Sequence, residues 1–68
     1  MTLEQARISA ALTISELSRQ AGISRTTIEK MERGDPVSAI SAQAVCTVLS
    51  ARLGRSLTPR ELDITVSR

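Results

Sequence analysis

The chain has 68 residues, one cysteine, no histidine and no aromatic residue, and its formal net charge is +2. This length suits one small domain whose core is built from aliphatic side chains. A single cysteine excludes an internal disulfide, and a structural zinc site of the usual kind is excluded as well. No apolar run reaches the ~18 residues of a membrane span, and residues 1–12 do not resemble a signal peptide. We therefore expect a cytoplasmic protein without a metal or other cofactor.

A first helix is predicted directly after Thr2. The residues Thr2-Leu3-Glu4-Gln5 fit a capping box, in which the first and last side chains each accept from the other residue's backbone N–H. Three small or apolar residues at helical spacing then form the expected buried side: Leu3, Ala6 and Ala10. The sequence therefore predicts a short amphipathic helix here.

Residues 13–34 contain two further helical patterns, at 14–21 and 25–33. Each pattern follows a residue type that caps helix N-termini well and ends before a glycine. Thr13 and Gly22 flank the first pattern, and Ser24 and Gly34 flank the second. Two short helices joined by about three residues make a helix-turn-helix.

The second of these helices has two different sides. At ~100° per residue, Ile28 and Met31 fall together and form the core side. The opposite side carries only polar and charged residues: Arg25, Thr26, Glu29, Lys30 and Arg33. Glu32 lies at the flank of the core side, where a carboxylate needs a partner. A charged side of this kind is often only a solvated surface. Because it belongs to the second helix of a helix-turn-helix, however, we interpret it as a surface that lies against DNA.

A longer helix is predicted after the connection at residues 35–39, because Pro36 cannot continue a helix through itself. Ile40-Ser41 fits a hydrophobic staple, with Ser41 as the N-cap and Ile40 packed on Val45. The apolar side of this helix consists of Val45, Leu49 and Leu53, with Cys46 as a further core residue and Gly54 as the stop.

The last part of the chain is predicted to form one more helical turn and then a tail. Thr58-Pro59-Arg60-Glu61 fits a second capping box and predicts a short fifth helix that carries Leu62. After it, apolar and polar residues alternate, which indicates an extended segment. This tail is either disordered or packed on the domain or on a second subunit. We therefore divide the chain into a helix-turn-helix domain at 1–62 and a tail at 63–68.

These residues resemble the Cro/repressor-type (XRE-like) helix-turn-helix family of phage and bacterial regulators. The matching residues are Leu17-Ser18, Gly22-Ile23-Ser24, Ile28 and Glu32-Arg33-Gly34. The resemblance covers roughly residues 2–62. It implies an all-α, compact bundle of four to five helices with a lambda-repressor-like fold, in which residues 25–33 enter the major groove of DNA.

The resemblance also implies roles for individual side chains. Base contacts would come from Arg25, Thr26 and Lys30, and phosphate contacts from Thr27 and Arg33. Arg7 would pair with Glu32 and so give this flanking carboxylate its partner.

Three positions depart from the family pattern. Ile14 replaces a glutamine that usually contacts phosphate, and Ala11 stands where glycine is common. An alanine there costs about 1 kcal/mol if the position needs a positive φ. Ile8 and Ile14 occupy positions that are usually polar, and together they would suit a protein-contact surface.

We therefore predict a transcriptional regulator that binds duplex DNA, and not an enzyme, because none of the nine serines has a histidine to activate it. A homodimer on two half-sites about 34 Å apart is expected. Regulation would come through concentration, competition for the operator or a separate protein partner. The alternative is a protein-interaction adaptor, such as an antitoxin or anti-repressor, which Ile8, Ile14 and the apolar tail would favour.

Overall fold

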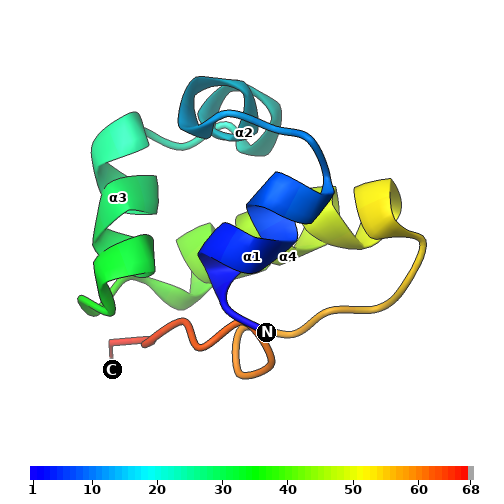
Figure 1. The fold of residues 1–68 in the computed structure, drawn as a ribbon. Helices are drawn as coiled ribbons and strands as arrows, with labels where there is room; N and C mark the ends of the chain where they lie inside the picture. Colours follow the sequence, from blue (N-terminus) through cyan, green and yellow to red (C-terminus); the bar gives the residue numbers. More distant parts are fainter. Residues whose placement is uncertain (68) are drawn as a thin grey trace.

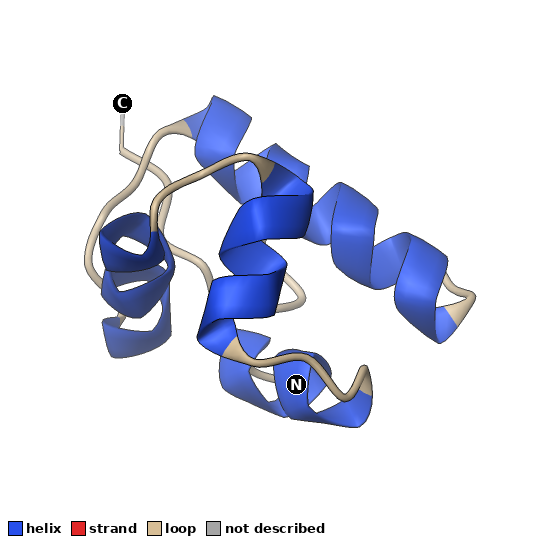
Figure 2. Cartoon of the chain, turned by 90° about the horizontal axis from the view of Figure 1, so that it is seen from above, coloured by secondary structure: helices blue, strands red, loops and turns tan. Residues whose placement is uncertain are grey.

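The computed structural model describes residues 1–67, and this part of the chain contains four helices. They are α1 (Leu3–Ser9), α2 (Ile14–Ala21), α3 (Arg25–Arg33) and α4 (Ala39–Leu53). In Figure 1, α1 and α4 lie at the centre, α2 lies above them and α3 stands at the left edge. Figure 2 shows only helices and connecting loops over these residues, which confirms the all-α prediction. Within residues 1–67, we find no helix that combines the length and the hydrophobicity of a membrane span.

The core is aliphatic and receives side chains from all four helices and from the C-terminal segment. Its largest fully buried side chains are Leu3, Leu17, Ile28, Met31, Val45, Cys46, Leu49 and Leu62. No polar or charged residue is buried within residues 1–67. Cys46 is a core residue as predicted, and burial raises the pKa of its thiol because the charged form would lose its hydration.

The bounds predicted for α2 and α3 are confirmed, because local caps define both helices. The Thr13 hydroxyl accepts from the Glu16 N–H at 3.0 Å, and the Thr13 N–H donates to Glu16 Oε1 at 2.9 Å. This second hydrogen bond lowers the pKa of the Glu16 carboxyl, since it favours the ionised form. α2 therefore starts with a complete capping box, of which only the Thr13 cap was predicted.

The predicted start of α4 is wrong by three residues. The N-cap is Ser38 and not Ser41, because the Ser38 hydroxyl accepts from the Ser41 N–H at 3.1 Å. The predicted packing of Ile40 on Val45 is wrong as well, since Ile40 is 84% exposed. α4 therefore begins at Ala39, three residues before the first helical residue that a cap at Ser41 implies.

The earlier start of α4 places a different apolar pair in the core. Val37 directly precedes the cap, Ala42 is the fourth helical residue, and both are buried. These are the two positions that a hydrophobic staple joins. Ser38 and Ser41 are equal as caps by residue type, so the burial of Val37 explains why the helix begins after Ser38.

Residues 59–63 form a turn and not the predicted fifth helix. The Thr58 hydroxyl accepts from the Glu61 N–H at 3.3 Å, as a cap would. The Glu61 carboxylate accepts from the Thr58 hydroxyl at 3.2 Å and lies 3.6 Å from Arg55 Nη2, so it does not complete a capping box. Asp63 has φ +56°, a left-handed conformation that ends the helical path after one turn.

The segment after this turn packs on the helical part of the chain. Two backbone hydrogen bonds, of 3.0 and 2.8 Å, join Val37 to it and form an isolated parallel bridge with Val66. Ile64 is buried. The segment returns below the helices toward the end of α3 (Figure 1). Residues 63–67 thus show the packed alternative, and residue 68 of the predicted tail lies outside the described residues.

Candidate nucleic-acid interface

The turn between α2 and α3 sets the position of α3. Gly22 has φ +71°, and its N–H donates to the Ser18 carbonyl at 2.9 Å. The Ile23 N–H donates to the same carbonyl at 3.1 Å, and the Ile23 side chain packs against the core. A Cβ added at Gly22 would meet no atom within 4 Å, so the left-handed backbone alone favours glycine here. Ser24 then caps α3 by accepting from the Thr27 N–H at 3.2 Å.

The inner side of α3 is attached to α1 by an ion pair. Arg7 Nε donates to Glu32 Oε2 at 2.7 Å, and Arg7 Nη2 donates to Glu32 Oε1 at 3.5 Å. Arg7 Nη1 donates to the Leu12 carbonyl at 3.0 Å, in the connection between α1 and α2. The two charged side chains are only 14% and 12% exposed. Ile28 and Met31 are buried on the same side, so apolar and ionic contacts together fix the orientation of α3.

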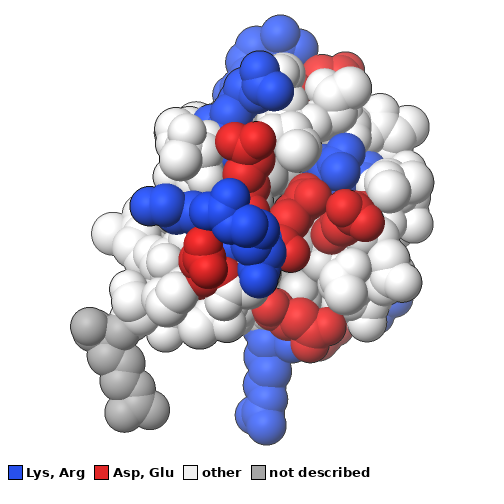
Figure 3. Space-filling view, turned by 60° about the vertical axis from the view of Figure 1, so that its left-hand side comes forward, with Lys and Arg blue, Asp and Glu red and all other residues white. Residues whose placement is uncertain are grey.

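The outer side of α3 is polar and faces solvent. Its exposed residues are the five that helical spacing assigned to it: Arg25, Thr26, Glu29, Lys30 and Arg33. Thr27 lies at the edge, half-buried, with its hydroxyl 2.9 Å from Ser24 Oγ. Figure 3 turns this side of the molecule forward and shows basic side chains interleaved with acidic ones. The structure thus places the predicted base-contact and phosphate-contact residues on one helix, with Thr27 set back from the others.

The turn that ends α3 places a carboxylate beside Arg33. The Gly34 N–H donates to the carbonyls of Lys30 and Met31, and the Asp35 N–H donates to the Lys30 carbonyl at 2.9 Å. Arg33 Nε and Nη2 both donate to Asp35 Oδ2, at 3.2 and 3.0 Å. Helical spacing predicts no partner for Arg33, so Asp35 was not expected. The available signal was its position two residues after Arg33, across a glycine that ends the helix.

The three positions that depart from the family pattern lie in the connection between α1 and α2 and in the two helices beside it. Ala11 has φ +58°, so this position does require the left-handed conformation. Ile14 is half-buried and packs against the core, whereas Ile8 is 62% exposed. Only one of these two isoleucines therefore lies fully at the surface, which weakens the case for a joint protein-contact surface.

Comparison with known proteins identifies a family. A family model described as Helix-turn-helix matches residues 3–58. The matched range contains all four helices, the turn between α2 and α3 and the whole outer side of α3. None of the curated proteins and none of the solved structures shows a significant match to the chain.

Proposed function

The chain belongs to the helix-turn-helix family, as its resemblance to Cro/repressor-type regulators indicated, and from this premise we propose that it binds duplex DNA as a sequence-specific transcriptional regulator. The contrast between the two sides of α3 carries the proposal. Ile28, Met31 and the Arg7–Glu32 pair anchor the inner side, so the outer side is free to present polar groups. The DNA major groove, about 12 Å wide, admits a helix of this kind.

We assign base contacts to Arg25, Thr26 and Lys30. Arg25 is the first residue of α3, and residues at this end of a helix in the major groove reach base edges. Among the described residues, neither Arg25 nor Lys30 takes part in an ion pair, so both cations are available to DNA. Arginine matches guanine O6 and N7 with two parallel donors, which makes guanine the expected partner of Arg25.

We assign phosphate contacts to Thr27 and Arg33. Thr27 lies in the first turn of α3, where the helix dipole favours an anion and no acidic residue is present. Arg33 lies in the last turn with its side chain 62% exposed. Contacts of this kind carry no sequence information, but they supply a large share of the affinity.

We also propose that two copies of the chain occupy two half-sites. The nine residues of α3 span about 13 Å, which covers one half-site only. Half-sites on the same face of DNA lie about 34 Å apart, a spacing that a homodimer can match. Ile40 is the most exposed large apolar side chain among residues 1–67, and we assign it to the contact between copies.

Sedimentation velocity of wild type and two glutamate variants tests this dimer. Ile40→Glu should shift the sedimentation coefficient toward that of a monomer, because a carboxylate would be buried at the contact. Ile8→Glu is the matched control, since Ile8 is also an exposed isoleucine but lies on α1. A wild type that stays monomeric at DNA-binding concentrations would contradict the dimer, and so would an Ile40→Glu variant that sediments like wild type.

DNA binding itself is tested by fluorescence anisotropy with duplex DNA at several salt concentrations. The logarithm of the affinity should fall linearly with the logarithm of salt concentration, because each phosphate contact releases counterions. Selection of bound sites from random duplexes should then give a defined half-site. No binding at about 50 mM salt would overturn the proposal and favour the adaptor alternative.

A pair of double variants separates sequence recognition from general charge. Arg25→Ala with Lys30→Ala removes two positive charges from the outer side of α3. Arg52→Ala with Arg55→Ala removes the same charge from the far end of α4. We expect the first variant to lose its sequence preference and the second to keep it. Equal loss of preference in both would show that α3 does not read the bases.

A further inference from the structure

Within residues 1–67, Arg33 is the only basic residue on the outer side of α3 that forms an ion pair. Two of its guanidinium nitrogens, Nε and Nη2, donate to the same oxygen of Asp35, at 3.2 and 3.0 Å. The backbone fixes the position of Asp35, because its N–H donates to the Lys30 carbonyl at 2.9 Å. Pro36 follows and restricts the chain further. The carboxylate therefore stays at the end of α3 whether or not Arg33 remains on it.

The Arg33–Asp35 pair is too weak to keep Arg33 from DNA, but strong enough to reduce its affinity. The side chains are 62% and 49% exposed, and exposed pairs contribute little because water and salt screen them. A phosphate that takes Arg33 must first replace the carboxylate. Since Asp35 then remains nearby, part of the attraction between Arg33 and the phosphate is cancelled.

We propose that Asp35 limits the affinity of this protein for DNA by competing with the phosphate backbone for the Arg33 guanidinium. The inference rests on the proposed DNA-binding function and adds a residue that sets its strength. Asp35 acts on a phosphate contact and not on a base contact, so it lowers the affinity for all sequences by the same factor and leaves the preferred site unchanged.

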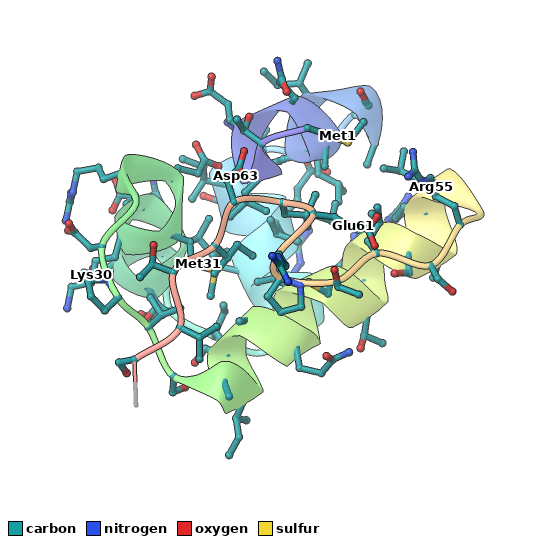
Figure 4. All side chains as sticks on the ribbon, turned by 90° about the horizontal axis from the view of Figure 1, so that it is seen from below. Met1, Lys30, Met31, Arg55, Glu61 and Asp63 are labelled. Atoms are coloured by element: carbon teal, nitrogen blue, oxygen red, sulfur yellow. The ribbon has the colours of Figure 1, made fainter. Side chains whose placement is uncertain are left out.

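A second exposed pair in the molecule provides a matched control. Arg55 Nη2 lies 3.6 Å from Glu61 Oε2, and these side chains are 57% and 47% exposed, close to the values for Arg33 and Asp35. Figure 4 shows Arg55 and Glu61 across the molecule from Lys30, away from the outer side of α3. Glu61→Gln therefore removes the same charge as Asp35→Asn in a similar setting, but outside the proposed interface.

The first experiment compares wild type, Asp35→Asn and Glu61→Gln by fluorescence anisotropy on one duplex that wild type binds. The salt concentration is about 150 mM, because charges more than about 8 Å apart are then largely screened. Asp35→Asn should bind about two- to five-fold tighter, the factor that corresponds to an exposed ion pair. The slope of its log affinity against log salt concentration should become steeper by up to about one, which corresponds to one more released counterion. Glu61→Gln should bind like wild type. Equal affinity of Asp35→Asn and wild type would overturn the inference, as would an equal gain in Glu61→Gln. Absence of wild-type binding would instead contradict the proposed function.

The second experiment asks whether Asp35 acts through Arg33. Arg33→Ala should weaken binding to every sequence and lower the salt slope by about one. Adding Asp35→Asn to Arg33→Ala should then give no further gain, because the guanidinium for which Asp35 competes is gone. If the double variant gains as much as the single one, Asp35 repels phosphate directly and the competition for Arg33 is wrong. Circular dichroism of each variant verifies that α3 is still formed.

Discussion

Two arginine–carboxylate pairs flank α3, one on its inner side and one at its outer end, and their surroundings give them different roles. Arg7 and Glu32 lie between α1 and α3 with little exposure to solvent. Arg33 and Asp35 lie at the end of one helix with about half of each side chain exposed. The chemical groups are the same in both pairs, so burial and the origin of the partners make the difference.

The inner pair joins distant parts of the chain and satisfies more of its hydrogen-bonding groups. All three guanidinium nitrogens of Arg7 donate, two to Glu32 and one to the Leu12 carbonyl. In the outer pair, two nitrogens of Arg33 share a single oxygen of Asp35. The inner pair therefore orients α3 in the fold, whereas the outer pair fixes no tertiary contact and remains exchangeable for a ligand.

The largest expected effect is on the inner pair. Glu32→Ala should lower the free energy of unfolding by about 3 kcal/mol, because it leaves the Arg7 guanidinium largely buried without its counter-charge. Urea unfolding followed by circular dichroism measures this change. Glu29→Ala is the control, since Glu29 is exposed one turn away on the outer side and should change stability by less than about 0.5 kcal/mol. Equal midpoints for Glu32→Ala and wild type would show that the inner pair contributes nothing to the fold.

The next effect belongs to the outer side and should appear in binding only. Arg25→Ala should weaken binding to the preferred site by about 1–3 kcal/mol and remove the preference at one base pair. Its unfolding midpoint should match that of wild type, because Arg25 is exposed and makes no ion pair within residues 1–67. The measurement is a set of binding titrations with each of the four base pairs at that position. A uniform loss on all four would make Arg25 a phosphate contact and would contradict the proposed docking of α3.

The parts of the molecule differ in how well the sequence predicts them. Residues 13–34 were predicted closely because their signals are local. Thr13 and Ser24 cap α2 and α3, and a left-handed glycine ends each helix. The roughly 3.6-residue period then separates the two sides of α3. The five exposed residues of the outer side follow from that period alone. Asp35 was missed because the period no longer applies once the left-handed Gly34 has ended α3.

The C-terminal half was predicted less well because distant contacts decide its local structure. Ser38 and Ser41 are equal candidates for the cap of α4, and the burial of Val37 favours Ser38. Val37 in turn bonds to the segment around Val66, which no local pattern links to it. Residues 59–63 have the composition of a helix start, but the left-handed Asp63 ends the turn.

A smaller effect is expected from relieving backbone strain in the connection between α1 and α2. Ala11 has φ +58°, a left-handed conformation. The residue is exposed, so its methyl group is not needed for packing in the core. Ala11→Gly should raise the free energy of unfolding by up to about 1 kcal/mol, because the left-handed conformation is penalised for alanine. Part of this gain is lost to the greater freedom of glycine in the unfolded chain. DNA affinity should not change, since Ala11 lies outside α3. Destabilisation by Ala11→Gly, measured in urea, would contradict a strained backbone at this position.

The smallest effect on stability is expected at the outer pair. Asp35→Asn removes an exposed ion pair, which contributes about 0.2–1 kcal/mol. It also removes a negative charge from the C-terminal end of α3, where the helix dipole makes such a charge unfavourable by about 0.3–1 kcal/mol. These two changes oppose each other, so the unfolding free energy should stay within about 0.5 kcal/mol of the wild-type value. The same variant should nevertheless bind DNA more tightly, because its neutral amide no longer competes with phosphate for Arg33. Urea unfolding and anisotropy on one preparation measure both quantities. If Asp35→Asn destabilised the protein as much as Glu32→Ala, solvent exposure would not explain the difference in role between the two pairs. Asp35 would then be needed to keep α3 in its position in the fold.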